Sequence, residues 1–265
     1  MIRDRPTGKY SLRAGLQPAG ACGRIAECGG LDGSVFREIG VFSVKICGIT
    51  TREDGRMVSD IGADAVGLNF YPRSRRFVSL EAAVQIARRL APGVRKVGVF
   101  VNASAEQILD AVGCVPLDAV QLHGDEPPEM LAQLGTIPVI RAFRLSQSGL
   151  GAAAEYLERC RQLGAVPAMV LVDAYHPGAY GGTGQRADWP AAAAYPLAPW
   201  HPPLVLAGGL DPDNVAEAIR AVRPRAVDTA SGVEGPAGRK DRRRVELFVR
   251  RARQALAELQ GDGER

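Results

Sequence analysis

The sequence predicts an α/β protein, a single (β/α)8 or TIM barrel with a poorly ordered N-terminal extension. Three observations lead to this fold class. From Val44 onward, short apolar runs of strand length alternate with segments of helical periodicity. Eight such pairs occupy about 220 residues, which matches the repeat number and size of this barrel. Polar or glycine residues also follow most of the apolar runs, at the strand ends where barrel enzymes carry their active sites.

The first 40 residues differ from the rest of the chain. They are rich in glycine, arginine and small residues and show no sustained period, so we expect residues 1–40 to be a disordered extension. A start codon assigned too far upstream would produce the same segment. Residues 41–260 are then the barrel domain, and residues 261–265 are a short tail.

The predicted strands are apolar runs of four to six residues. In chain order they are Val44–Cys47, Ala65–Asn69, Lys96–Val101, Ala119–Leu122, Val139–Phe143, Met169–Asp173, Leu204–Ala207 and Ala226–Thr229.

The segments between these runs have helical spacing, and Thr51, Ser79, Ser104 and Asp211 are predicted to cap four of them. The predicted helices are Arg52–Ile61, Leu80–Leu90, Ala105–Val112, Pro128–Leu134, Gly151–Leu163, Trp189–Tyr195, Asp213–Val222 and Asp241–Leu259. A doubly wound open sheet shares this alternation and is the alternative architecture.

The charge and hydropathy of the sequence indicate which kinds of ligand and partner the protein binds. The net charge of +4 is mildly basic, but the Lys and Arg residues are interspersed with Asp and Glu, which favours a small anionic ligand over nucleic acid. No apolar run approaches the roughly 18 residues that span a bilayer, and the N-terminus lacks the layout of a secretory signal. We therefore expect a cytoplasmic protein without a membrane partner.

Cysteine and histidine usage argues against disulfides and metal sites. The five cysteines are scattered and odd in number, which is typical of reduced thiols, and the three histidines lack zinc-ligand spacing. Cys22 and Cys28 could form a metal or redox clip, but no second pair or histidine accompanies them. Cys47 ends the first predicted strand, where a catalytic group is expected in a barrel, although a lone cysteine there is more often part of the core.

Two glycine-containing loops predict a phosphate site. Gly208 and Gly209 follow the seventh strand, and Ser231 and Gly232 follow the eighth, where barrels of this kind bind phosphate through backbone amides. The alternative is that these glycines only form tight turns. A third glycine-rich loop, Tyr180–Gly184, is long enough for a mobile flap, and an ordinary surface loop fits its composition equally well.

Several segments in chain order resemble the phosphoribosylanthranilate isomerase family of tryptophan biosynthesis. They are Lys45–Thr50, Gly62–Gly67, Phe70–Pro72 with Ser74–Arg76, Val97–Asn102, Gln121–Gly124, Asp173, Tyr180–Gly184, Ala207–Leu210 and Ser231–Glu234. The match runs from Val44 to about Ala255. It implies a cofactor-free Amadori rearrangement of N-(5'-phosphoribosyl)anthranilate by a monomer or homodimer.

The resemblance assigns the general acid to Asp173 and the general base to Cys47. The acid must carry its proton at neutral pH, whereas a free aspartic acid titrates near 3.9, so burial or nearby negative charge is needed. The thiol must ionise, although a free cysteine titrates near 8.5. Lys45 points to the same side of the strand as Cys47, and we hypothesise that its charge lowers the thiol pKa.

By the same resemblance, Arg76 binds the anthranilate carboxylate and His123 lies near the pocket. Arg76 could instead belong to a solvated loop, because three arginines occur within four residues, and His123 could be a structural group. Asp228 is expected to orient the phosphate loop or to cap a turn. Together with Gly208, Gly209, Ser231 and Gly232 these are the expected substrate-binding residues.

The sequence departs from the family pattern after the flap glycines, where Gln185-Arg186-Ala187 replaces a segment that begins with lysine. Ala230 also replaces a serine. Two alternatives stay open: another phosphosugar barrel enzyme, which would carry metal-binding histidines or a Schiff-base lysine, and a non-catalytic phosphate-binding barrel.

Overall fold

The computed structural model describes residues 42–145, 149–174, 187–196, 198–235 and 238–262. By its internal contacts the chain divides into residues 1–36 and 37–265, and all described residues belong to the second unit. The predicted extension, the predicted flap and most of the tail lie outside the described residues. Those predictions therefore stay predictions.

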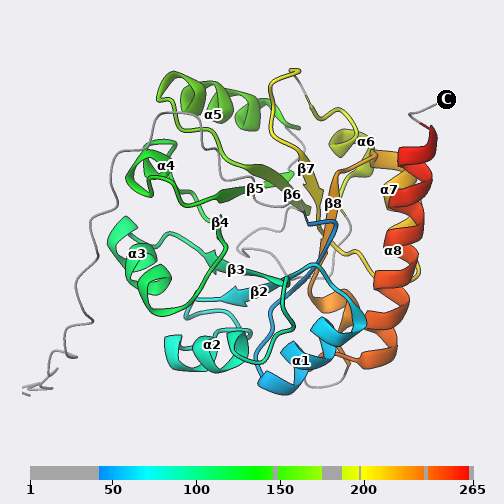
Figure 1. Ribbon diagram of the computed structural model, residues 1–265. Helices are drawn as coiled ribbons and strands as arrows, with labels where there is room; N and C mark the ends of the chain where they lie inside the picture. Colours follow the sequence, from blue (N-terminus) through cyan, green and yellow to red (C-terminus); the bar gives the residue numbers. More distant parts are fainter. Residues whose placement is uncertain (1–41, 146–148, 175–186, 197, 236–237, 263–265) are drawn as a thin grey trace, which may run out of the picture. The chain divides into compact units, whose positions relative to one another are not determined.

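Eight parallel strands close into a barrel in which each strand pairs with the next and β8 pairs with β1 (Figure 1). The β1–β8 pairing, with Lys45 opposite Asp228, rules out the open sheet. The strands are β1 (Val44–Cys47), β2 (Ala65–Asn69), β3 (Arg95–Phe100), β4 (Ala119–Leu122), β5 (Val139–Leu145), β6 (Met169–Ala174), β7 (Leu204–Leu206) and β8 (Ala226–Thr229).

The helices surround the barrel (Figure 1). They are α1 (Arg52–Ile61), α2 (Leu80–Ala87), α3 (Ala105–Cys114), α4 (Glu129–Gln133), α5 (Gly151–Gln162), α6 (Trp189–Ala192), α7 (Val215–Val222) and α8 (Arg242–Asp262), with a 3-10 turn, η1, at Ser231–Val233. All eight predicted strand–helix pairs are confirmed, and differences in their boundaries are confined to the ends.

Three of the predicted helix caps are confirmed. Thr51, Ser79 and Ser104 accept hydrogen bonds from backbone amides in the first turns of α1, α2 and α3. The fourth is wrong in position, because Asn214 precedes α7, while Asp211 accepts from the amides of Asp213 and Asn214 in the turn that leads into the helix.

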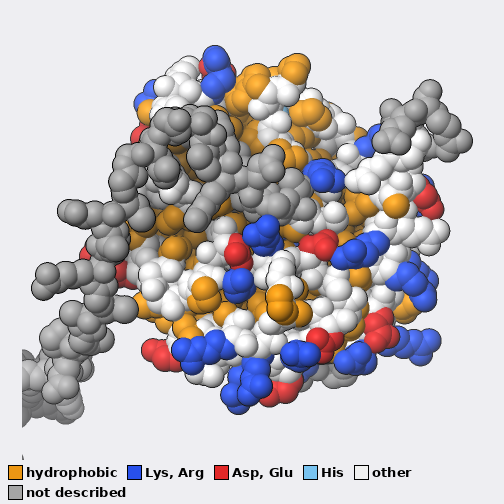
Figure 2. All heavy atoms as spheres, viewed as in Figure 1, with side chains coloured by type: hydrophobic (Ala, Val, Ile, Leu, Met, Phe, Trp, Pro, Cys, Tyr) orange, Lys and Arg blue, Asp and Glu red, His pale blue; other side chains and the backbone are white. Residues whose placement is uncertain are grey.

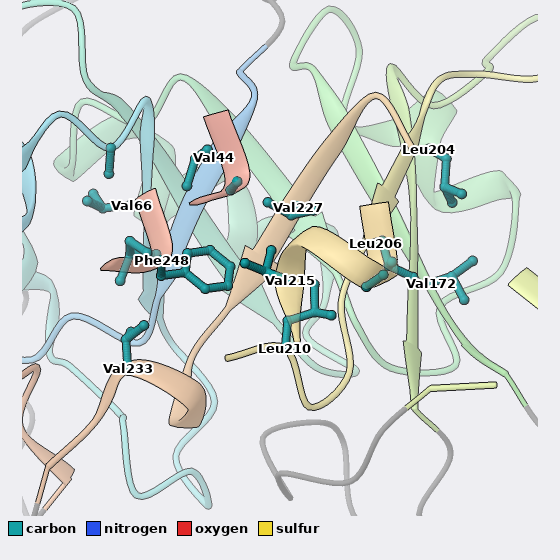
Figure 3. Close-up of a cluster of buried hydrophobic side chains, with 14 of the residues drawn as sticks. Val44, Val66, Val172, Leu204, Leu206, Leu210, Val215, Val227, Val233 and Phe248 are labelled. Atoms are coloured by element: carbon teal, nitrogen blue, oxygen red, sulfur yellow. The ribbon is translucent and has the colours of Figure 1, made fainter. Parts of the chain in front are cut away.

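Two layers of apolar packing hold the fold together. Mostly small side chains fill the barrel, including Ala65, Ala119, Ala142, Ala207 and Ala226. Larger side chains on the outer strand faces pack against the helices, as Figure 3 shows for Val44 and Val227 near Phe248 of α8 and Val215 of α7. Full burial of one such side chain contributes roughly 1.5–3 kcal/mol, so the double layer gives the site a rigid frame.

The surface carries charges of both signs. On the face shown in Figure 2, Lys and Arg side chains are interspersed with Asp and Glu, as the composition suggested. Among the described residues, no helix combines the length and apolar character needed to cross a bilayer.

Candidate active site

Strand pleating places several polar side chains inside the barrel, toward the carboxyl ends of the strands. Successive side chains of a strand point to opposite faces, and the apolar lining of the barrel fixes which positions face inward. The inward-facing polar residues considered as site candidates are Lys45 and Cys47 of β1, Gln121 of β4, His123 directly after β4, Asp173 of β6 and Asp228 of β8.

Lys45 and Asp228 form a buried ion pair on adjacent strands. The lysine Nζ lies 2.9 Å from Asp228 Oδ2, and the side chains are 0% and 7% exposed. Burial alone would lower the pKa of Lys45, but the Asp228 carboxylate and the Cys47 thiol raise it above its ordinary value. Lys45 is therefore a fixed positive charge in the barrel. Asp228 binds Lys45 through Oδ2. The expected alternative, that Asp228 caps a turn, is therefore wrong.

Cys47 lies two residues beyond Lys45 and faces the same interior. Its partner in the β1–β2 register is Gly67, where an added Cβ would lie 2.6 Å from Sγ. Glycine at this position therefore makes room for the thiol. The Cys47 residue is half-buried, so its thiol lies at the boundary between the packed barrel and the space above it.

Burial raises the pKa of the Cys47 thiol above its ordinary value. The charge of Lys45 opposes this rise, as do the more weakly acting charges of Lys240 and Arg76, while Asp228 adds to it. Lys45 thus acts in the direction that the sequence suggested. Burial nevertheless outweighs it, so ionisation of the thiol depends on the cations around it.

The Lys45→Met variant is expected to move the titration of Cys47 to higher pH, because it removes the strongest opposing charge. The pH dependence of Cys47 alkylation by iodoacetamide, followed by mass spectrometry of its peptide, measures this shift. The control is Lys96→Met, which breaks the ion pair between Lys96 and Asp118. This variant should leave the midpoint of Cys47 alkylation unchanged. An unchanged midpoint in Lys45→Met would show that Lys45 does not lower the pKa of the Cys47 thiol.

Asp173 faces the barrel interior from β6, and two contacts fix its carboxylate. Oδ1 accepts a hydrogen bond from the amide of Ala174 at 2.8 Å, and Oδ2 lies 3.2 Å from Nε2 of His123. The other ring nitrogen of His123, Nδ1, is 2.8 Å from Nε2 of Gln121. All three side chains are buried, so β4 and β6 together form a polar group inside the barrel.

Three buried polar atoms in this region have no hydrogen-bond partner among the described residues. They are Oδ1 of Asp228, Oε1 of Gln121 and Nε2 of His123, which is near Asp173 but not aligned with it. Burial raises the pKa of Asp228; Lys45 opposes this, and the negative charge of Asp173 adds to it. Because buried polar atoms are normally satisfied, these atoms point to a polar ligand.

A second charged cluster surrounds the carboxylate of Glu234. Arg76 donates to it through Nε at 2.6 Å and Nη2 at 2.9 Å, and Lys240 donates through Nζ at 2.9 Å. The Lys240 side chain is fully buried and also donates to the carbonyl oxygen of Ala230. Arg76 is buried as well, and Glu234 fixes its guanidinium group, so Arg76 is not part of a solvated loop.

Arg76 and Ser231 line one polar cavity of about 430 Å³ together with Thr50, Arg75, Glu234, Gly235, Gly238 and Arg239. The loops after β2 and β8, which carry these two predicted site residues, therefore meet at this cavity.

The loops after β7 and β8 are tied to each other. Thr229, at the end of β8, donates through Oγ1 to the carbonyl oxygen of Leu210 at 2.6 Å. Within the loop after β7, Asn214 donates to the carbonyl oxygen of Gly209 at 2.9 Å. Gly208 and Gly209 have φ values of 86° and 64°, which side chains disfavour. A Cβ at Gly232 would collide with the Leu210 carbonyl oxygen. Glycine is therefore required at these positions, either for the backbone conformation or because the loops after β7 and β8 approach each other closely.

Arg141 of β5 does not face the barrel interior with the polar side chains of β1, β4, β6 and β8. Its side chain points outward, where it donates to the carbonyl oxygens of Leu122 and Gly124 and to Glu126. The guanidinium also lies 4.9 Å from the ring centroid of Tyr156. Arg141 therefore supports the loop that follows β4.

Sequence reasoning did not single out Gln121, Glu234 and Lys240. The first two lie within segments that carried the family resemblance, which was the available signal. Lys240 stands in a basic run that resembles a solvated surface. Among the described residues, no group of three or more His, Cys, Asp or Glu side chains could hold a metal ion.

Comparison with known proteins identifies the family. The family model for N-(5'-phosphoribosyl)anthranilate isomerase matches residues 44–251. The isomerase of Geobacter sulfurreducens is 46% identical over 211 residues, which cover 79% of this chain and 98% of that protein. The isomerase of Geobacter sp. (strain M21) is 45% identical over 213 residues, covering 79% and 97%.

Solved structures agree with this assignment. The phosphoribosylanthranilate isomerase of Thermotoga maritima has a TM-score of 0.68 at 42% identity, covering 80% of this chain and 99% of that one. A further isomerase structure, in complex with reduced 1-(o-carboxyphenylamino)-1-deoxyribulose 5-phosphate, has a TM-score of 0.66 at 40% identity with the same coverage. The chain belongs to the N-(5'-phosphoribosyl)anthranilate isomerase family.

Proposed function

We propose that this isomerase converts N-(5'-phosphoribosyl)anthranilate to 1-(2-carboxyphenylamino)-1-deoxyribulose 5-phosphate in tryptophan biosynthesis, with Asp173 as general acid and Cys47 as general base. The observation that carries the proposal is that both side chains face the barrel interior, from β6 and β1, at the carboxyl ends of the strands. A relative bound to the reduced form of this product supports the choice of substrate.

The first step opens the ribose ring. Asp173 gives its proton to the ring oxygen as the bond from C1 to that oxygen breaks. The lone pair of the anthranilate nitrogen then forms a double bond to C1, which gives a protonated Schiff base. Protonation of a departing oxygen by a positioned carboxyl group is general acid catalysis, and the Asp173 carboxyl is held inside the barrel for it.

The second step moves electrons from C2 toward C1. The Cys47 thiolate takes the proton from C2, the electrons of that bond form a C1–C2 double bond, and the imine electrons return to nitrogen. The resulting enolamine gains a proton at C1 and loses one from the 2-hydroxyl, which leaves the ketone. C1 is reduced and C2 is oxidised, so the balance needs no external oxidant.

Substrate binding is assigned to the two ends of the site. The Nη1 group of Arg76 makes no hydrogen bond with the described residues, and we assign it to the anthranilate carboxylate. The loops at Gly208–Gly209 and Ser231–Gly232 are the proposed phosphate site, with backbone amides as donors. Asp228 Oδ1, which has no hydrogen-bond partner among the described residues, is available to the sugar between them.

The Glu234→Gln variant is expected to raise KM about tenfold with little change in kcat, because Arg76 loses its bidentate anchor and lies beside the buried Lys240 without a countercharge. Steady-state kinetics checks this. The control is Glu246→Gln, which breaks an exposed pair with Arg242 on α8. A KM that stays constant or falls would mean that Glu234 competes with the substrate for Arg76.

The activity itself is tested by the loss of substrate fluorescence after addition of the purified full chain in the presence of a chelator. The proposal predicts a loss proportional to enzyme concentration, beyond spontaneous decay of the substrate. A rate equal to spontaneous decay would favour the non-catalytic barrel.

A further inference from the structure

We propose that Gln121 is a positioning residue for Asp173 that acts through the imidazole of His123. In this proposal the Gln121 amide and the ring reverse their hydrogen bonds together as the acid gains or loses its proton. The catalytic consequence rests on the proposed function, whereas the coupling itself is a property of the three side chains.

The three side chains form one buried series across the barrel. Gln121 and His123 are alternate residues along β4 and its extension, so both face inward, and Asp173 faces them from β6. Nε2 of Gln121 is 2.8 Å from Nδ1 of His123, and Nε2 of His123 is 3.2 Å from Oδ2 of Asp173. Their exposed fractions are 1%, 8% and 7%.

Proton counting links the two ends of this series. A neutral imidazole has one nitrogen that donates and one that accepts. When Asp173 is ionised it can only accept, so His123 must carry its proton on Nε2, and Nδ1 accepts from the Gln121 amide nitrogen. When Asp173 is protonated its hydroxyl donates to Nε2. The proton of His123 is then on Nδ1, and Gln121 must present its oxygen.

The structure allows this reversal at little cost. Oε1 of Gln121 has no partner among the described residues, so a half-turn of the amide exchanges its oxygen and nitrogen without breaking another hydrogen bond. Nε2 of His123 is close to Asp173 but not aligned with it, so the ring is not locked into one arrangement. A glutamine is suited to this position because its amide both donates and accepts.

Orientation at Asp173 makes the coupling testable in the resting protein. The amide of Ala174 donates to Oδ1, so the oxygen of an asparagine at position 173 should stay there. Its NH2 group then faces His123 in the place of Oδ2 and donates to Nε2. Asp173→Asn therefore imitates the protonated acid without any turnover.

Nitrogen-15 NMR of the histidine rings in the full chain is the direct test. The chain has three histidines, and loss of a signal set in His123→Asn assigns the ring in question. As the pH rises and Asp173 loses its proton, we expect the ring in the unchanged protein to pass from the Nδ1–H form to the Nε2–H form, whereas Asp173→Asn should keep the Nδ1–H form. The same ring state in both proteins at every pH, whether either neutral form or the doubly protonated ring, would overturn the proposal.

Kinetics separates positioning from a purely structural role. Gln121→Met keeps the length of the side chain but cannot hydrogen-bond through an amide, and it should lower kcat on the order of tenfold while KM stays within about twofold. Gln107→Met is the control, because Gln107 belongs to the capping box of α3. An unchanged kcat in Gln121→Met would overturn the positioning role.

The proposed function and the coupling of Gln121, His123 and Asp173 can fail separately. A chain without isomerase activity that still shows the exchange of ring forms would sink the proposed function and keep the coupling. An active chain with one ring form in both proteins would sink the coupling alone.

Discussion

Replacing Cys47 with alanine is expected to lower kcat/KM by about 10²–10⁴-fold, the range that a positioned general base contributes. The thiol is the inward-facing group at the end of β1, and a methyl group in its place can accept no proton from C2. The loss should fall on kcat, because the thiol contributes little to binding the substrate in its ground state. Steady-state kinetics on the fluorescence signal measures both constants.

The matched control for this variant is Cys114→Ala. Cys114 is an exposed free thiol at the end of α3, outside the barrel interior. Its replacement should leave the kinetics unchanged. Activity of Cys47→Ala within about threefold of the unchanged protein would exclude the thiol as the base, since a general base contributes far more.

Replacing Asp173 with asparagine should lower kcat by about 10²–10⁴-fold, because the amide cannot protonate the ring oxygen. The hydrogen bond from Ala174 and the contact with His123 can both be kept, so the fold should be preserved. Circular dichroism melting reports the fold, and Asp213→Asn, an exposed residue, is the control. Near-normal turnover in a folded Asp173→Asn protein would assign the acid elsewhere.

The two variants should differ in the step that they block. Asp173→Asn keeps the ring closed, so no Schiff base can form on the enzyme. Cys47→Ala can open the ring but cannot proceed to the enolamine. Rapid-scan absorbance during a single turnover should therefore show an early species in Cys47→Ala and none in Asp173→Asn. The reverse result would exchange the two roles.

The fold was predictable because the same sequence pattern, a short apolar run followed by a segment of helical spacing, repeats along the chain. Each strand is a short apolar run whose length and position survive without tertiary information, and each of the helix caps at Thr51, Ser79 and Ser104 is a local hydrogen bond. Cys47 and Asp173 could be placed at one end of the barrel because the carboxyl ends of parallel strands meet there.

The remainder depends on contacts between distant parts of the chain. Arg141 ends in an outward-facing position because Ile140 and Ala142 fill the barrel, and its polar partners come from the loop after β4. The pairing of Arg76 with Glu234 joins residues 158 positions apart. Neither spacing nor composition encodes such a contact, so the charged cluster around Glu234 emerges only from the assembled barrel.

The central claim is that the Cys47 thiolate removes the proton from C2, and the most direct test compares two titrations of the free enzyme. The midpoint of the rising limb of kcat/KM against pH should coincide with the midpoint of Cys47 alkylation. Both midpoints should move to higher pH together in Lys45→Met. A kinetic limb that stays in place while the alkylation midpoint moves would show that another group is the base.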